Sequence, residues 1–440
     1  MKKTVTILGC GTGNGKDLTA EAYEALARAD LIIGAKRLLE ASFITDIRMR
    51  SGGKNTAPAK CIPLHAAEEI AAAVRDAGDE SIVIPVSGDS GFYSGAASYA
   101  AAIEKGSSET AVPKIRILPG ISSLSYLSAR TGIAWQDAEV YSLHGRRQSI
   151  GGALRRGAKI LLLGGEGFEE VLRSMNDAGF SGRKIIAGMR LGSREEKILH
   201  GTPASLKGKV SEALSVLLIA GSEERMRCSG IDDEEFIRAD VPMTKSEVRA
   251  VVLSRLAAGR GDVVYDIGAG TGSVSVEASF AAPCGSVYAI ERNDTACRLI
   301  EKNREKFLAG NIEIVKGDAP DAFSDLPAPD CVFIGGSGGN LHEIFTSLAA
   351  KNPRVHVVLT AVTIETLQSA TRAVEECGFG CTEITQIAAT RYNRRGIYHM
   401  PESQSPVWVI AARPESEQKL NRVLRRRELK TKLKETVKNA

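Results

Sequence analysis

The strongest constraint on the fold lies in the second half of the chain, where an apolar strand runs into a glycine-rich loop and then a helix. The stretch is VVYDIGAGTGSVSVEAS, in which Asp266 is followed by Gly268, Gly270 and Gly272. Glycines permit a tight turn and let the backbone approach a ligand at the start of a helix. A dinucleotide-binding loop would carry a further glycine where Ser273 stands. The spacing therefore favours S-adenosylmethionine over NAD.

Two carboxylates follow this loop at the ends of the next two predicted strands. Glu291 ends SVYAIE about twenty residues beyond the glycines, where a carboxylate can accept hydrogen bonds from ribose hydroxyls. Asp318, followed by Ala319, comes after the next strand and is placed to face an adenine amino group. Asp266 has the alternative role of capping the loop. Together these residues predict a cofactor pocket.

The whole chain has the alternating pattern of an α/β protein, in two series. Short β-branched runs alternate with alanine-rich helical patterns up to residue 220, and a second series of seven strands ends in a predicted antiparallel pair. The polar stretch 221–242 ends in proline, which is typical of a linker. We therefore predict a first domain at 1–220, a linker at 221–242, a second domain at 243–413 and a basic helical tail at 414–440.

Composition excludes several classes of function. The net charge is +4, but residues 415–440 hold nine Lys/Arg against four Asp/Glu, so the rest of the chain is near −1. That balance argues against a nucleic-acid partner, which needs clustered cations. The first residues lack the apolar h-region and cleavage site typical of a signal peptide, no apolar run reaches membrane-spanning length, and the cysteines and histidines have no metal-ligand spacing. We expect a cytoplasmic protein without a metal site.

The second half resembles the decarboxylating methyltransferases of cobalamin biosynthesis that act at carbon 15 of the macrocycle. The matching stretches are PMTKSEVRAVVLSRL, DIGAGTGSVSVEAS, KGDAPDAF and CVFIGGSGGNLHEIF. The resemblance implies a Rossmann-like class I fold of seven strands. Because the substrates of that family carry many carboxylates, cations near the pocket mouth are the expected anchors. The candidate substrate-binding residues are Thr244, Arg249, Gly336, Arg391 and Arg394, and the candidate catalytic residues are Lys245 and Arg395.

The first half resembles the tetrapyrrole methylase (class III) superfamily, and within it the members that act at carbon 5 of a corrin precursor. The resemblance rests on ILGCGTGNG, VSGDSGFYSGA, PGISSLSYLSARTG and LLLGGEGF. It implies two α/β lobes with the cofactor between them, held by Gly9, Gly11, Gly88, Asp89, Ser90 and Ser122. For Ser122 a helix N-cap is the alternative role.

Two further residues of the first half are candidates for chemistry. His144 ends a predicted strand, where open α/β sheets bind ligands, and could shuttle a proton. Arg146 is the candidate substrate anchor. The sequence departs from the superfamily pattern at Thr12 and Ser90, where proline is usual, and this leaves the cofactor affinity of the first half open.

The combined resemblance implies a bifunctional methyltransferase of corrin biosynthesis, with S-adenosylmethionine as cofactor and a small tetrapyrrole as substrate. It would methylate a precorrin-6 or precorrin-7 type substrate at carbons 5 and 15 and decarboxylate its ring C acetate. One alternative is an RNA or small-molecule methylase, although the Asn/Asp-Pro-Pro-aromatic motif of many base and amine methylases is absent. Another is that only the second domain is active and the first is a tetrapyrrole-binding scaffold. We also expect self-association into a homo-oligomer.

Overall fold

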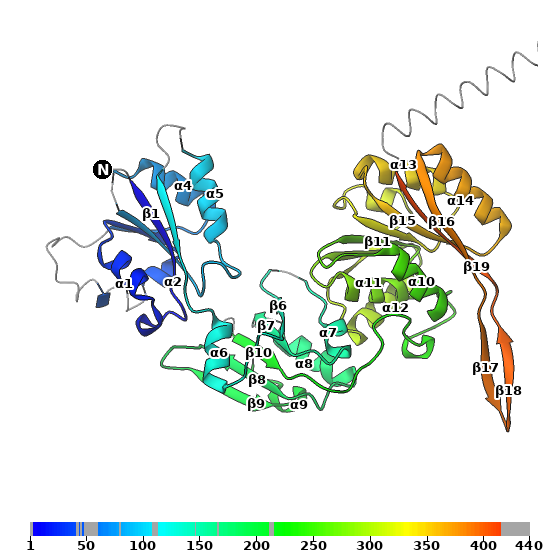
Figure 1. Ribbon diagram of the computed structural model, residues 1–440, viewed down its shortest axis with the longest axis horizontal. Coiled ribbons are helices and arrows are strands. Elements are labelled where there is room, and N and C mark those ends of the chain that lie inside the picture. Colours follow the sequence, from blue (N-terminus) through cyan, green and yellow to red (C-terminus); the bar gives the residue numbers. More distant parts are fainter. Residues whose placement is uncertain are drawn as a thin grey trace, which may run out of the picture.

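The computed structural model describes residues 3–40, 44, 46–47, 60–78, 81–107, 113–145, 147–164, 167–210 and 215–414. Figure 1 shows three α/β units, two built from the first half of the chain and one from the second. From residue 415 onward, the predicted basic tail lies outside the described residues. Within the described part, no helix combines the length and the apolar character that a membrane crossing requires.

The first lobe is a parallel sheet in the order β3-β2-β4-β1-β5. The central strands β1 and β4 are almost wholly buried, as their β-branched runs predict. The strands are β1 (Thr4–Gly9), β2 (Leu31–Gly34), β3 (Lys60–Pro63), β4 (Ser81–Val86) and β5 (Lys114–Leu118). The helices are η1 (Gly15–Asp17), α1 (Ala20–Ala27), α2 (Lys36–Leu39), α4 (Ala67–Asp76) and α5 (Ala96–Lys105).

The second lobe is a mixed sheet in the order β6-β7-β10-β8-β9. Strands β6 and β7 are parallel, and the other neighbours are antiparallel. The strands are β6 (Glu139–Ser142), β7 (Ile160–Gly164), β8 (Ile185–Met189), β9 (Lys197–Gly201) and β10 (Ser215–Ile219). The helices are α6 (Ser123–Thr131), α7 (Gly151–Arg155), α8 (Phe168–Asp177) and α9 (Pro203–Leu206).

The second domain is a seven-stranded sheet in the order β13-β12-β11-β14-β15-β19-β16, in which β19 runs antiparallel to its two neighbours, β15 and β16. The predicted class I order is therefore confirmed. The strands are β11 (Val263–Ile267), β12 (Ser286–Glu291), β13 (Ile312–Lys316), β14 (Cys331–Ile334), β15 (His356–Ala361), β16 (Phe379–Ile387) and β19 (Val407–Pro414). The helices are η2 (Asp233–Glu235), α10 (Ser246–Leu256), α11 (Ser273–Ala281), α12 (Asp294–Lys306), η3 (Asp321–Phe323), α13 (Leu341–Lys351) and α14 (Ile364–Glu376).

An additional hairpin, which the sequence did not predict, lies between β16 and β19. Strands β17 (Thr390–Arg395) and β18 (Tyr398–Ser403) pair only with each other and project from the domain (Figure 1). Nearly all of their residues are exposed, so the hairpin has no buried face to produce an apolar alternation. The exposed strands β3 and β9 were missed for the same reason.

The polar segment 221–242 is packed against both domains. The Arg155 guanidinium of α7 contacts the carbonyl of Arg227 at 2.5 Å and the carboxylate of Glu235 at 2.9 Å. The backbone N–H groups of Gly230 and Ile231 donate to the carboxylate of Glu277 on α11 at 2.8 and 3.0 Å. The segment therefore differs from an extended tether, because its polar groups bind each domain.

The two domains also meet directly, through a seam of small residues. Ser149 forms an antiparallel bridge with Ala309, and its N–H donates to the carbonyl of Pro283 at 3.1 Å. A side-chain carbon at Gly151 would lie 1.8 Å from the carbonyl oxygen of Phe307. Leu308 of the second domain packs into the core of the second lobe. The second lobe and the second domain thus share a close-packed boundary.

Candidate active sites

A cleft of about 690 Å³ lies between the two lobes of the first domain. It opens at the carboxyl ends of β1 and β4, where their glycine-rich loops meet in a bridge between Gly11 and Gly88. Five of the sequence-predicted residues line it, namely Gly11, Gly88, Asp89, Ser122 and His144. The structure therefore brings together residues from three separate motifs.

Asp89 organises this cleft. One carboxylate oxygen accepts the N–H of Gly120 at 3.0 Å, and the other accepts the N–H of Gly91 at 2.9 Å. Asp89 thereby ties the loop after β4 to the turn after β5. Ser122 lines the cleft and also caps α6, since its hydroxyl accepts the N–H of Ser125 at 3.1 Å. Both roles considered for Ser122 are compatible with its position.

Gly9 and Ser90 are not among the residues that line the cleft, and their contact with a cofactor stays a prediction. A side-chain carbon at Gly9 would lie 2.6 Å from the carbonyl oxygen of Gly88. Gly9 is therefore needed for the close approach of two loops. Ser90 is buried and is not a lining residue.

His144 follows β6 and is exposed at the cleft, as its place after a strand predicted. Arg146 lies outside the described residues. Sequence reasoning missed the lining residues Arg37, Tyr93 and Arg190. The last two have left-handed backbones, with φ of 47° and 49°, which non-glycine residues rarely adopt. A turn of this kind leaves no mark in the sequence.

The second pocket has a volume of about 410 Å³ and lies at the carboxyl ends of β11, β12, β13 and β14. Six of the sequence-predicted residues line it, namely Gly268, Gly270, Glu291, Asp318, Ala319 and Gly336. Gly268 has a φ of 72°, and a side-chain carbon there would lie 2.6 Å from the carbonyl oxygen of Gly336. Glycine is thus required where the loops after β11 and β14 touch.

Glu291 connects the glycine loop to the start of α12. One carboxylate oxygen accepts the N–H of Gly270 at 2.9 Å, and the other accepts the N–H of Asn293 at 2.9 Å. Each oxygen keeps acceptor capacity for a ligand hydroxyl. Asp318 lies 3.4 Å from the guanidinium of Arg292, and its side chain is largely exposed.

Gly272 and Asp266 are not among the residues that line the pocket, and their contact with a cofactor stays a prediction. Gly272 precedes α11 and packs against Ile300. Asp266 is buried and accepts the hydroxyl of Ser275 at 2.5 Å, while its other oxygen has no hydrogen-bond partner in the described part of the chain. Burial raises the pKa of Asp266 to about 7.

We expect Asp266→Asn to flatten the pH dependence of stability. The pKa of Asp266 lies above the unfolded value of about 3.9, so the folded chain holds a proton that the unfolded chain has lost between these pH values. The contribution of Asp266 to the free energy of unfolding is therefore fully present below about pH 4 and is lost as the pH rises to 7. At pH 8 the thermal midpoint of the variant should exceed that of the wild type by about 8 °C or more, because three pKa units are worth about 4 kcal/mol, with no such gain at pH 4. Parallel pH profiles would contradict this assignment.

Arg249 is fully buried, which corrects its predicted role as a substrate anchor. Its guanidinium donates to Glu277 at 2.6 Å, to Asp233 at 3.3 Å and to the carbonyl oxygens of Thr244 and Ile231. All its donors point into the protein. Thr244 contributes its carbonyl to this cluster, and the N-cap position of α10 belongs to Lys245 rather than to Thr244.

The other predicted cations of the second domain lie apart from the pocket. Lys245 lies 3.8 Å from Asp233, and Arg391 lies 3.7 Å from the same carboxylate. Arg391 also binds Glu247 at 2.6 Å, which holds the pKa of that carboxyl down at about 2. Arg394 and Arg395 are exposed at the hairpin end, where Arg394 binds the carbonyl of Gly396. The structure does not bring these cations to the pocket wall.

Sequence reasoning missed one wall of the second pocket, formed by Asp240, Val241 and Pro242. A side-chain carbon at Gly270 would lie 2.8 Å from the carbonyl oxygen of Pro242, so this segment covers the glycine loop closely. The polarity of this stretch and its terminal proline predict a linker, which is why a pocket wall was not expected here. The proline was the available signal, since it fixes the chain just before α10.

A two-lobed α/β domain with a cleft between its lobes, followed by a seven-stranded class I domain with its own glycine-loop pocket, defines a fusion of two methyltransferase folds. Residues 4–207 match the family model of tetrapyrrole (corrin/porphyrin) methylases, and residues 235–412 match that of the precorrin methyltransferase domain. The chain belongs to the family of precorrin-6Y C(5,15)-methyltransferases (decarboxylating). The enzyme of this name from Sinorhizobium sp is 30% identical over 371 residues, which cover 82% of this chain and 85% of that protein.

Two further relatives each match less than half of the chain. A probable cobalt-precorrin-6B C(15)-methyltransferase (decarboxylating) from Pyrobaculum calidifontis is 42% identical over 186 residues, or 42% of this chain and 95% of that protein. A crystal structure of a precorrin-6Y C5,15-methyltransferase from Geobacter metallireducens GS-15 is 42% identical and covers 43% of this chain and 97% of that chain, with a TM-score of 0.41.

Proposed function

We propose that this protein is a bifunctional S-adenosylmethionine-dependent methyltransferase of corrin biosynthesis. It methylates a tetrapyrrole of the precorrin-6B or precorrin-7 type at carbons 5 and 15 and removes carbon dioxide from the ring C acetate, toward precorrin-8. The observation that carries the proposal is the presence of two separate glycine-loop pockets in one chain. The similarity to the Sinorhizobium enzyme, which spans both domains, supports it.

The second pocket fits S-adenosylmethionine. The backbone at Gly268 and Gly270 would lie against the amino-acid end of the cofactor. The Glu291 carboxylate would accept hydrogen bonds from its ribose hydroxyls, and the Asp318 carboxylate would accept one from its adenine amine. In the first cleft the loops at Gly11 and Gly88 would provide backbone contacts. The bound cofactor supplies an electrophilic methyl group.

The residues of both pockets act by orienting the reactants and excluding water, because methyl transfer is an in-line displacement with little need for acid or base. The nucleophilic carbon comes from the conjugated macrocycle. His144, at the first cleft, is placed to take a proton from the ring. Decarboxylation leaves carbanion character that the macrocycle delocalises. Lys245 and Arg391, near the start of α10, are the cations best placed to meet substrate carboxylates outside the pocket, each still sharing Asp233.

The alternative, a first domain that only binds the tetrapyrrole, rests on Thr12 and Ser90. Thr12 donates to Asp17 and lies against Gly192 of the second lobe, so it closes the cleft at one point. If the first cleft of the natural chain does not bind the cofactor and the double variant Thr12→Pro, Ser90→Pro does, the natural first domain is a scaffold.

The decisive experiment counts cofactor sites by calorimetry. The intact chain should bind two S-adenosylmethionine molecules, and Glu291→Ala should weaken one site by about a hundredfold because two N–H groups and the ribose lose their acceptor. Glu313→Ala, an exposed carboxylate on β13, is the matched control and should keep both sites. One site in the wild type and none in Glu291→Ala would restrict the activity to the second domain.

Self-association and a cytoplasmic location remain predictions. The projecting hairpin supports self-association, because large exposed apolar side chains favour a protein contact. The side chains between half and four-fifths exposed on it are Tyr392, Ile397, Tyr398 and Met400.

A further inference from the structure

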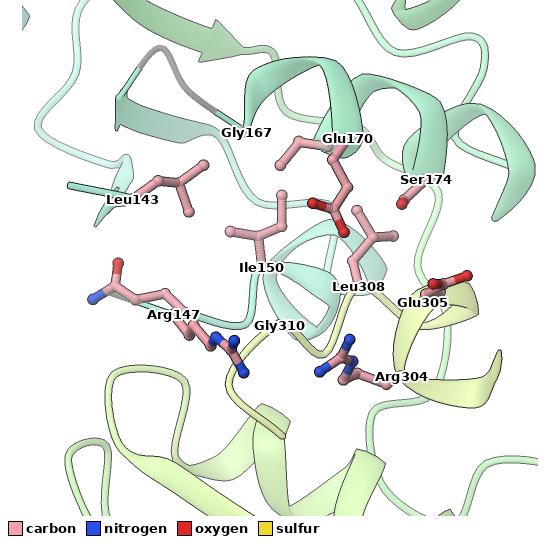
Figure 2. Close-up of a pocket in the computed structure, with 12 residues that line it drawn as sticks. Leu143, Arg147, Ile150, Gly167, Glu170, Ser174, Arg304, Glu305, Leu308 and Gly310 are labelled. Atoms are coloured by element: carbon pink, nitrogen blue, oxygen red, sulfur yellow. The ribbon is translucent and has the colours of Figure 1, made fainter. Parts of the chain in front are cut away.

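A third cavity, of about 320 Å³, lies at the boundary between the two domains. Figure 2 shows its walls, which come from the loop after β6, from α8 and from the end of α12. It shares no lining residue with the first cleft or with the second pocket. The cavity is therefore separate from both candidate active sites.

Its floor is fixed by the seam between the domains. Gln148 is buried, and its side-chain oxygen accepts the N–H of Ser142 at 2.6 Å. A side-chain carbon at Gly310 would lie 2.7 Å from the carbonyl oxygen of Gln148, so the two domains touch there. Ile150 and Leu308 add a buried apolar surface. The cavity thus belongs to the packed boundary and needs no rearrangement to form.

Four charged side chains line the cavity: the guanidinium groups of Arg147 and Arg304 and the carboxylates of Glu170 and Glu305, of which Glu305 follows Arg304 on α12. The guanidinium groups of Arg147, from the first domain, and Arg304, from the second, lie on the side of Gly310, whereas the Glu170 carboxylate enters from α8 across the aliphatic floor (Figure 2). Arg304 is held by the carbonyl of Ile312 at 3.2 Å and by Glu301 at 2.5 Å. Arg147 is exposed and has no ion-pair partner within the part of the chain that the structure describes. Two guanidinium groups on one side of an apolar floor favour a carboxylate on a short aliphatic chain.

The position of the cavity relates it to both methyl-transfer sites. Leu143 and Arg147 flank His144, which lines the first cleft, so the same loop forms a wall of each. Helix α12 begins beside the second pocket at Asn293 and Ala296 and ends in the cavity at Arg304. At 1.5 Å per residue, this part of α12 spans about 15 Å.

We propose that this interdomain cavity is an additional docking site for the polycarboxylate tetrapyrrole, in which one acetate or propionate arm is held by Arg147 and Arg304. Glu170 repels a carboxylate from the far side and thereby orients the arm toward the two guanidinium groups. The macrocycle is retained between the two domains that modify it. This inference rests on the proposed function for the identity of its ligand.

The test titrates the intact protein with uroporphyrin, a tetrapyrrole with eight carboxylates, and follows the porphyrin fluorescence with both cofactor sites saturated. Arg147→Ala, which removes a charge, and Ser174→Trp, which fills the cavity, should each weaken binding about tenfold, the worth of one charge-assisted hydrogen bond or more. Arg225→Ala removes an exposed arginine outside the cavity and should leave the titration unchanged.

Cofactor stoichiometry is measured on the same samples. Equal affinities in the wild type and both cavity variants, or no uroporphyrin binding by a wild type that holds its cofactors, would overturn the docking site and leave the proposed function standing. Failure of the wild type to bind S-adenosylmethionine at all would instead refute the proposed function.

Discussion

Arg249→Met lowers the free energy of unfolding of the second domain by about 3–5 kcal/mol, the usual cost of removing one partner from a buried ion pair. Methionine occupies much of the same volume, but it leaves the carboxylates of Glu277 and Asp233 buried without their main cation. Burial already raises the pKa of Glu277, and Arg249 opposes that rise. The variant should therefore destabilise α10, α11 and the segment at 230–233 together.

The measurement uses the fluorescence of Trp408, on β19, during urea unfolding. The chain has two tryptophans, so a Trp135→Phe background makes Trp408 the reporter for the second domain. Arg255→Met, on the same helix, removes a partly exposed ion pair with Glu383 and should cost about 1 kcal/mol or less. Adding Glu277→Gln to Arg249→Met should recover part of the loss. A cost for Arg249→Met no larger than that of Arg255→Met would refute the buried cluster.

The same cluster explains which parts of the site could be predicted from the sequence. The pocket-lining residues Gly268, Glu291 and Asp318 follow from a local rule, because each stands at the end of a strand and parallel strands end at one edge of a sheet. Arg249 obeys no such rule. A cation beside apolar residues is usually at the surface, and only the three-dimensional fold buries it between Asp233 and Glu277.

The fold was predictable to a similar extent. Buried strands such as β4, β7 and β14 have continuous apolar runs and were found, whereas exposed strands such as β17 and β18 have none and were missed. At 221–242 polarity does not distinguish a linker from a packed segment, since a polar residue bound by another domain has the same letter as a solvated one. Glu235 and Asp240 look alike in the sequence, yet one contacts the first domain and the other a pocket.

Gly151→Ala opens the boundary between the two domains. The added carbon would lie 1.8 Å from the carbonyl oxygen of Phe307 and 2.9 Å from the ring of Phe280, and the first contact is backbone that cannot rotate away. The hydrogen bonds from Ser149 to Pro283 and from Gly151 to Leu308 must then break or stretch. We expect a loss of about 3 kcal/mol or more in the coupling between the domains, from overpacking and lost hydrogen bonds together.

The two tryptophans separate this effect from a general loss of stability. Trp135 reports on the second lobe and Trp408 on the second domain, and in the wild type their unfolding transitions should coincide because the boundary is close-packed. In Gly151→Ala the transitions should separate. Gly182→Ala is the control within the same lobe, since nothing lies within 4 Å of the added carbon. Coincident transitions in Gly151→Ala would mean that the seam carries little of the coupling, which would then fall to Arg155 and its contacts with Arg227 and Glu235.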